Sequence, residues 1–293
     1  MPMPEPGSFP IIDTLMGVPH GPDDTAWRTM MAATLRDKES KETFRFPAEY
    51  MYKQLPAERT ALGADSVVAE MDRWGIQRGL INVTFSDEVA MAALQQHPDR
   101  FIGCYPVDPN RGMDCVREMH RAVKELGVRA AGAFPAGYTP QVPINDKRFY
   151  PIYATCVELD IPIFCCAGVP GPRVPMAPQK VELIDEVMYD FPELTFVTRH
   201  GCEPWEDLAV KLMLKWPNLY YSTSAFAPKH YPKAIIDYAN TRGADKIIYA
   251  GYFPMGLSLE RIMTDMQQVG LKDEVWPKFL RQNAMRVLKL TDD

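Results

Sequence analysis

Short apolar runs rich in β-branched residues alternate along the chain with stretches of helical periodicity. The runs lack strict alternation of polar and apolar positions, which is typical of strands buried on both faces of a parallel sheet. Between them, as in residues 111–127, apolar side chains recur every three or four positions and form one stripe. The predicted strands cover residues 9–15, 79–83, 101–105, 128–131, 161–166, 194–197, 219–222 and 246–250.

Eight strand–helix units in 293 residues predict an α/β fold, a (β/α)8 TIM barrel that forms a single domain over residues 1–293. A doubly wound open sheet is the alternative, but no Gly-x-Gly-x-x-Gly turn follows any predicted strand. The barrel is therefore the preferred interpretation. A long C-terminal helix is expected over residues 273–288, and it makes a homodimer possible.

One segment, residues 20–63, interrupts this rhythm between the first strand and the helix expected to begin near Asp65. A connection of this length is usually functional or carries helices of its own. In a barrel it would leave the C-terminal end of the first strand, where active sites lie. Two interpretations of this insertion stay open: a cap that covers apolar surface, and a lid that shapes a substrate pocket.

Composition and charge exclude several classes of protein. The chain is 46% hydrophobic and 24% charged, which is ordinary for a globular domain. Its net charge is −6 and no basic block stands out, which argues against nucleic acid or an anionic membrane as partner. The six cysteines contain no Cys-x-x-Cys pair, and residues 1–10 lack the layout of a signal peptide. We expect a cytoplasmic protein that binds a small-molecule substrate and needs no cofactor.

Several sequence motifs in the second half of the chain follow one another at the spacing of a known family: residues 197–205, 216–224 and 243–255. Residues 97–101 and 146–168 extend the match. The chain resembles the amidohydrolase-related family, in the branch that includes aminocarboxymuconate semialdehyde decarboxylase and similar aromatic-acid decarboxylases, hydratases and lactonases. This resemblance also implies a (β/α)8 barrel.

The resemblance further implies where a divalent metal would bind. The family usually supplies a His-x-His pair on strand 1, a His ending strand 5, a His on strand 6 and an Asp ending strand 8. A catalytic zinc needs about three protein ligands and an open position. Here a set of Cys166, His200 and Asp13 is conceivable, but we expect no metal. The five family positions are occupied by Leu15, Gly17, Cys166, His200 and Tyr252.

Three residues are candidates for catalysis. Alternation along strand 6 puts Thr198 and His200 on one face and Arg199 on the other, and the resemblance points His200 into the barrel. An imidazole that titrates near neutrality there can act as general acid or base. Tyr252 can donate to a developing oxyanion, or it simply fills the volume of the missing metal. Cys166 is either a nucleophile activated by a base or a small buried hydrophobe.

Four further residues are candidates for substrate binding. Arg173, in the loop after strand 5, can hold a carboxylate bidentately, or it is a solvated loop residue. Glu203 is expected to cap the sixth helix, with a role as general acid as the alternative. His20 lies just beyond strand 1 and can reach the mouth of the barrel. Asp13 is a candidate if strand 1 turns its side chain inward.

The preferred function is a metal-independent hydrolase or lyase that acts on a small carboxylated or acyl substrate, with His200 as general acid or base. A catalytically silent barrel that serves as a binding or scaffold subunit is the alternative from another class. A metal-dependent decarboxylase with an unusual Cys-His-Asp site is the third hypothesis. A polar cavity around His200 would favour an enzyme. The scaffold would be favoured by an apolar plug made of Leu15, Met16, Phe253 and Met255.

Overall fold

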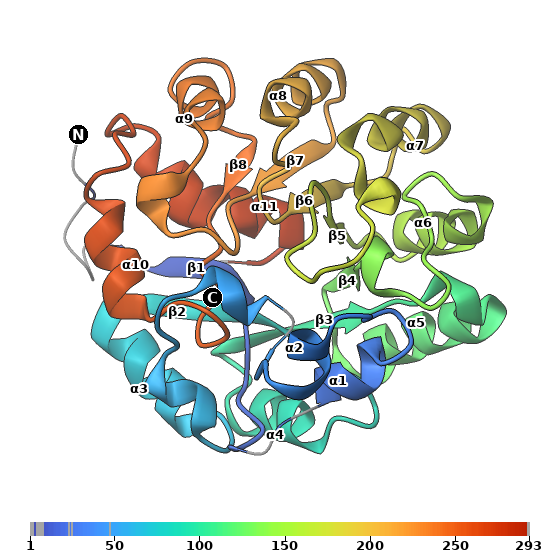
Figure 1. Cartoon of the computed structure of the whole chain (residues 1–293). Helices are drawn as coiled ribbons and strands as arrows, with labels where there is room; N and C mark the ends of the chain where they lie inside the picture. Colours follow the sequence, from blue (N-terminus) through green and yellow to red (C-terminus); the bar gives the residue numbers. More distant parts are fainter. Residues whose placement is uncertain (1–2, 4–8, 23, 25, 47, 292–293) are drawn as a thin grey trace.

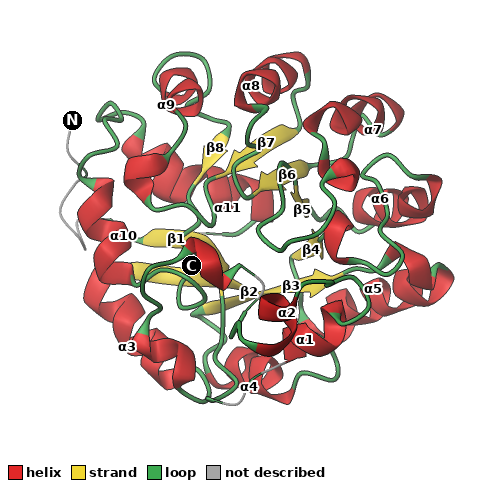
Figure 2. Ribbon diagram, in the orientation of Figure 1, coloured by secondary structure: helices red, strands yellow, loops and turns green. Residues whose placement is uncertain are grey.

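The computed structural model describes residues 3, 9–22, 24, 26–46 and 48–291. Eight parallel strands follow one another in chain order around a single sheet, and helices surround it (Figure 2). This arrangement confirms the predicted (β/α)8 barrel. The strands are β1 Ile11–Met16, β2 Ile76–Asn82, β3 Phe101–Pro106, β4 Ala130–Ala133, β5 Ile163–Cys166, β6 Phe196–Arg199, β7 Leu219–Ser222 and β8 Ile247–Ile248.

The barrel closes between β1 and the residues that follow β8, because β8 itself is only two residues long. The amide of Thr14 donates to the carbonyl of Tyr249 at 3.2 Å, and that of Gly17 donates to Phe253 at 2.9 Å. Tyr252 returns a bond of 3.0 Å to the carbonyl of Leu15. The segment after β8 is therefore fixed at the mouth of the barrel by main-chain bonds.

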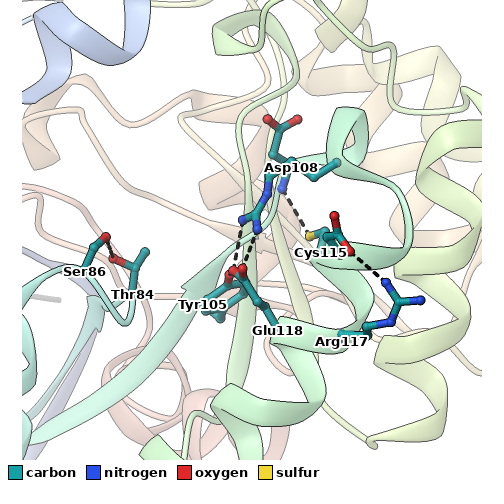
Figure 3. Close-up of polar contacts among 9 residues, drawn as sticks. Thr84, Ser86, Tyr105, Asp108, Cys115, Arg117 and Glu118 are labelled. Carbon is teal, nitrogen blue, oxygen red and sulfur yellow. Dashed lines mark hydrogen bonds and ion pairs between the residues drawn. The ribbon is translucent and has the colours of Figure 1, made fainter.

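The outer layer is fixed to the strands by apolar faces and by a few polar contacts. Helix α5 (Met113–Leu126) ends at Gly127, whose φ of 63° is the left-handed conformation that favours glycine at this position. Tyr105 leaves β3 on its outer face and donates to Glu118 of α5 (Figure 3). Arg111 also donates to Glu118, at 3.0 Å. The helices between the strands are α3 Asp65–Trp74, α4 Glu88–Gln96, α5, α6 Tyr150–Glu158, α7 Ile184–Asp190, α8 Glu206–Lys215 and α9 Lys233–Ala239, and α10 Leu259–Met266 follows β8.

The interior of the barrel holds an apolar cluster that is distinct from the core between the strands and the outer helices. The end of the chain covers one end of this cluster. Helix α11 (Asn283–Leu288), preceded by a π-helical turn at Lys278–Gln282, contributes the floor. This is the helix expected over residues 273–288. Because its apolar face is buried against its own barrel, it does not offer that face to a second chain. The cluster consists of Ile12, Leu80, Ile102, Cys104, Ala130, Phe164, Val197, Ile248, Ala284, Val287 and Leu288.

The insertion after β1 carries two helices, α1 (Ala26–Met31) and α2 (Lys38–Glu42), and short 3-10 turns. It lies across the end of the barrel in Figure 1, where it is coloured blue. At its base His20 and Leu62 form an antiparallel bridge, and the amide of Gly63 donates to the carbonyl of Pro19 at 3.0 Å. The chain therefore leaves the barrel and returns to it at nearly the same point.

Two further features bear on the sequence analysis. All six cysteines are free and buried. Across the part of the chain that the structure describes, we find no helix with both the length and the apolar character needed to cross a membrane.

Candidate active site

The C-terminal ends of β6, β7 and β8 share an unusual backbone conformation. His200, Ala225 and Tyr252 have φ values of 67°, 73° and 70°, and Cys202 has 61°. Non-glycine residues seldom adopt this left-handed region, and such positions concentrate at functional sites because the surrounding structure must hold them there. Strand ends at this face of a barrel are also where active sites lie.

Strand β6 turns Val197 and Arg199 into the barrel, and the left-handed turn at His200 ends its alternation. Val197 belongs to the interior cluster, so Arg199, two residues later, also points into the barrel. Thr198 faces the helical layer instead. The prediction that His200 would follow the face of Thr198 is wrong, because the backbone leaves the strand at His200. Its ring lies edge-on to Tyr252, with 5.6 Å between ring centroids.

Ser224 fixes the orientation of His200. The Ser224 hydroxyl oxygen accepts the main-chain N–H of His200 at 3.0 Å and lies 3.2 Å from Nδ1. Within the described residues, Nε2 has no hydrogen-bond partner. Burial, and then the charge of Arg199, lower the pKa of His200 to about 3. The imidazole is therefore neutral near pH 7, in contrast to the expectation that it titrates near neutrality.

Tyr252 is covered by an aromatic side chain of the insertion. The ring of Tyr52 stacks on Tyr252 with 6.2 Å between centroids, and its hydroxyl donates to the carbonyl of Ala225 at 2.9 Å. A β-carbon at Gly256 would lie 2.6 Å from the Tyr52 ring, so a glycine is needed for this close approach. Burial raises the pKa of Tyr252 to about 12, so its phenol is a hydrogen-bond donor at neutral pH.

We expect Tyr52→Phe to lower the stability of the fold by about 1 kcal/mol, because the carbonyl of Ala225 loses its donor. Tyr50→Phe is the matched control, since the Tyr50 hydroxyl also donates to a carbonyl, that of Gly171, but lies in a more exposed position. Chemical denaturation of both variants measures the difference. Equal effects would show that the Tyr52 bond does not hold the insertion over the mouth.

Arg173 holds the insertion to the loop after β5. Its guanidinium lies 2.9 Å from the Asp37 carboxylate and 2.7 Å from that of Glu39, and it stacks over the ring of Tyr50 at 4.8 Å. The guanidinium that was a candidate for binding a substrate carboxylate is therefore paired with two carboxylates of the insertion. Arg173 is placed instead to position the insertion.

Cys166 faces the barrel interior, on the same face of β5 as Phe164, whereas Cys165 belongs to the outer core. Burial raises the pKa of the Cys166 thiol to about 12, and the charge of Arg199 offsets only part of this effect. Since the thiolate is the nucleophile, a protonated thiol does not favour the nucleophilic role. Burial favours the alternative, a small hydrophobe.

Asp13 is fully buried and faces the helical layer, because its neighbour Ile12 belongs to the interior cluster. Its Oδ1 accepts the main-chain N–H groups of Leu15 and Gly251, each at 2.9 Å. Burial raises the pKa of Asp13 to about 7, although these bonds and the hydroxyl of Tyr249 lower it in part. The carboxyl group is therefore separated from the inward face that carries Cys166.

His20 lines a cavity of about 200 Å³ at the ends of β1, β2 and β8. Its Nε2 lies 2.8 Å from Oδ1 of Asp87, and this hydrogen bond raises the pKa of His20. Met16 and Met255 line the same space beside charged groups, so these two methionines do not form an apolar plug. The cavity is lined by Met16, Gly17, Val18, Pro19, His20, Asp24, Arg59, Asn82, Asp87, Ala90, Pro254 and Met255.

Glu203 does not cap the sixth helix. The chain turns at residues 201–204, and α8 begins only at Glu206, with Trp205 as its N-cap and no side-chain bond there. The prediction of a capping carboxylate is therefore wrong. Burial and the nearby charge of Glu206 raise the pKa of Glu203. Its main-chain carbonyl accepts the amide of Val169 at 2.8 Å and joins the loops after β5 and β6.

A comparison with protein families decides the relationship of the chain. The profile of the amidohydrolase family matches residues 16–290. The chain belongs to the amidohydrolase family. This confirms the resemblance found in the sequence and the prediction of an amidohydrolase-related enzyme.

Solved structures show the same fold at low identity. An uncharacterized TIM-barrel protein from Bordetella bronchiseptica is 24% identical with a TM-score of 0.72, covering 96% of this chain and 99% of its own. A manganese-bound 5-carboxyvanillate decarboxylase from Novosphingobium aromaticivorans is 21% identical with a TM-score of 0.71, covering 97% and 98%. A 4-oxalomesaconate hydratase from Rhodopseudomonas palustris is 18% identical with a TM-score of 0.61, covering 96% of each chain. The comparison with curated proteins finds no match.

The metal site implied by the amidohydrolase family does not fit the residues of this member. Among the residues that the structure describes, no group of three or more His, Cys, Asp and Glu side chains is placed to hold a metal ion. Cys166 and His200 lie at the mouth, but Asp13 faces the helical layer and is held there by main-chain donors. Two donors do not make a catalytic zinc or manganese site.

Three residues of this amidohydrolase site are not among the candidates predicted from the sequence: Arg199, Ser224 and Tyr52. Arg199 is 5% exposed and lies over the ring of Phe164 at 5.0 Å. No local signal marks it, because a strand that is buried on both faces does not show which face lies inside the barrel. Ser224 and Tyr52 reach the site through contacts between distant segments, for which the local pattern carries no signal.

Proposed function

We propose that this amidohydrolase is a metal-independent lyase that acts on a small carboxylic acid at the mouth of the barrel. The observation that carries the proposal is the pairing of His200 with Tyr252, in which Ser224 orients the imidazole and Tyr52 stacks on the Tyr252 ring. The manganese-bound 5-carboxyvanillate decarboxylase and the 4-oxalomesaconate hydratase that share the fold support a lyase on a carboxylated substrate.

In this proposal His200 and Tyr252 divide the chemistry between them. Cleavage of a carbon–carbon or carbon–oxygen bond next to a carboxylate leaves negative charge on the substrate. The Tyr252 phenol donates a hydrogen bond to that charge, since burial keeps it protonated. In the loss of water from an acid, the neutral imidazole of His200, oriented by Ser224, takes the proton from carbon at Nε2 as the C–H bond breaks, and the imidazolium returns it to the departing hydroxyl, which leaves as water.

Hydrolysis, the other activity expected from the sequence, is less well supported. The imidazole of His200, with its pKa lowered to about 3, is a weak base in either reaction, and hydrolysis needs in addition a nucleophile, either an activated water or a thiolate. The Cys166 thiol is protonated as well. The same two observations favour the second candidate function, a catalytically silent barrel that binds a small molecule without converting it.

Direct assays separate these functions. The chain is incubated with 5-carboxyvanillate, 4-oxalomesaconate and a panel of related carboxylic acids, together with lactones, and products are followed by mass spectrometry. Loss of carbon dioxide or water from an acid supports the lyase, and lactone opening supports a hydrolase. Binding of an acid measured by calorimetry, without turnover of any compound, would identify the silent barrel.

We expect exhaustive treatment with a chelator to leave the activity within about twofold of the untreated enzyme, because the described residues supply no complete set of ligands. Metal analysis of the purified protein accompanies the assay. An activity that disappears on chelation and returns with added manganese or zinc would contradict metal independence and support the third hypothesis from the sequence.

We also propose a cytoplasmic location and no nucleic-acid partner, supported by the net charge of −6 and the lack of a basic block. A homodimer stays a prediction, and size-exclusion chromatography with light scattering tests it.

A further inference from the structure

Strand β1 is irregular next to the candidate site. Asp13 pairs with Gly79 of β2, but Met16, three residues later, pairs with Ile81, only two residues later. One extra residue of β1 therefore bulges out of the ladder. Such bulges occur beside active sites, where they change the direction of side chains and leave main-chain groups unpaired. On its other side, β1 bonds to the segment that carries Tyr252.

One oxygen of Asp13 bonds the main chain on both sides of this irregularity. Oδ1 accepts the main-chain N–H of Leu15 at 2.9 Å and that of Gly251, also at 2.9 Å. The carbonyl of Leu15 accepts the main-chain N–H of Tyr252 at 3.0 Å. The three hydrogen bonds form a closed ring through Asp13, Leu15 and residues 251–252. This ring fixes the turn in which Tyr252 adopts its left-handed φ of 70°.

The contact between Asp13 and Gly251 is so close that it requires a glycine. A β-carbon at Gly251 would lie 2.5 Å from Oδ2 of Asp13 and 2.7 Å from the hydroxyl of Tyr249. The backbone of Gly251 is not left-handed, so its conformation does not itself demand glycine. The carboxyl group is the reason for the small residue. Because Asp13 is fully buried, the two amides depend on its oxygen and not on solvent.

We propose that Asp13 is a positioning residue that holds the Tyr252 turn at the mouth of the barrel. Asp13 faces the helical layer and acts through main-chain bonds, not by contact with a substrate. Without its oxygen the turn loses an anchor and the phenol moves. A displacement of about 1 Å at a reacting group can lower a rate by about 10²-fold. The effect on turnover rests on the proposed function, whereas the anchoring of the main chain does not.

Two substitutions of Asp13 separate its oxygen from its charge. Asp13→Ala removes the acceptor and should lower kcat about 10- to 100-fold, with KM within about threefold of wild type. Asp13→Asn keeps an oxygen that accepts from Leu15 and Gly251 and should retain at least about a third of the wild-type kcat. Equal losses in the two variants, or no loss in Asp13→Ala, would refute the proposal.

A double-mutant cycle with Tyr252→Phe tests whether Asp13 acts through the phenol. When the phenol hydroxyl is absent, Asp13→Ala should lower kcat by less than about twofold, because the group that Asp13 positions is no longer there. A residue that only supports the fold would give the same loss in both backgrounds, and that result would overturn the positioning role.

Asp108→Ala is the matched control, since Asp108 also accepts an amide two residues ahead, that of Asn110 at 2.9 Å, but follows β3. Its kcat should equal that of the wild type. Gly251→Ala keeps both Asp13 and Tyr252 but pushes the carboxyl group away, so it should also lower kcat at least about tenfold. It serves as the test if Asp13→Ala does not fold, and an unchanged kcat in a folded Gly251→Ala would contradict the proposal.

Hydrogen exchange of the unliganded chain, followed by mass spectrometry, tests the anchoring without any substrate. Asp13→Ala should speed exchange at residues 251–252 at least about tenfold, and Asp13→Asn should not. Turnover of an acid by the wild type together with unchanged exchange in Asp13→Ala would refute the role of Asp13 and leave the proposed function standing. Faster exchange in Asp13→Ala without turnover of any acid by the wild type would support the anchoring of Tyr252 and count against the proposed function alone.

Discussion

His200→Asn is expected to reduce turnover by a factor of about 10² to 10⁴, the usual contribution of a positioned acid or base. Asparagine accepts the left-handed backbone that His200 adopts at φ 67°, and the main-chain bond to Ser224 is kept. The fold and its thermal midpoint should therefore change little. Steady-state kinetics on the substrate identified by the panel, with circular dichroism as the check on folding, measures the effect.

His120→Asn is the matched control, because His120 lies on α5 outside the barrel, 3.9 Å from Glu158. Its turnover should equal that of the wild type. Ser224→Ala should give an intermediate loss, since the imidazole stays but loses the hydroxyl that orients it. Turnover within threefold of wild type in His200→Asn would mean that another residue transfers the proton.

Asp13→Asn is expected to stabilise the fold at pH 8 and to leave it nearly unchanged at pH 4. Burial raises the pKa of Asp13 from 3.8 to about 7. Between these values the folded chain keeps a proton that the unfolded chain releases, so wild-type stability falls as the pH rises through this window. The loss is at most about 4 kcal/mol and is complete above pH 7. The amide does not titrate, and its oxygen still accepts from Leu15 and Gly251.

Urea denaturation of wild type and variant at several pH values between 4 and 8 measures this difference. The depressed pKa of His200 acts in the opposite direction, because the unfolded chain then binds the extra proton below pH 6.5, but it is common to both proteins and cancels. Asp265→Asn is a control. The Asp265 carboxylate lies 3.7 Å from Nε of Arg261, so this variant should be less stable than the wild type at pH 8. A pH-independent difference would show that Asp13 does not carry a raised pKa.

The fold could be predicted because each strand is a short apolar run with a clear end. The run at residues 219–222 coincides with β7, and that at residues 101–105 is one residue short of β3. Boundaries differ most where a run continues into an irregular segment, as at residues 246–250, of which only two residues form β8. The packing of α11 against the end of the barrel could not be predicted, since an apolar stripe on a helix does not show which surface it will contact.

The candidate site could be predicted only where a residue belongs to a recognisable sequence motif of the family. His200 and Tyr252 belong to such motifs, and in the structure their rings are in contact. The face of Arg199 could not be predicted, because strands buried on both faces do not show which face is inside. The partners of Arg173 lie more than 130 positions away in the chain, a separation at which local pattern carries no information.

The bridge between His20 and Leu62 has an evolutionary consequence. Because the two ends of the insertion meet there, whole segments of different length can be exchanged at this point while the register of β1 and β2 is kept. The insertion, with Tyr50 and Tyr52, can therefore change in sequence and length as one unit. Ligand preference can then differ between relatives whose barrels are the same.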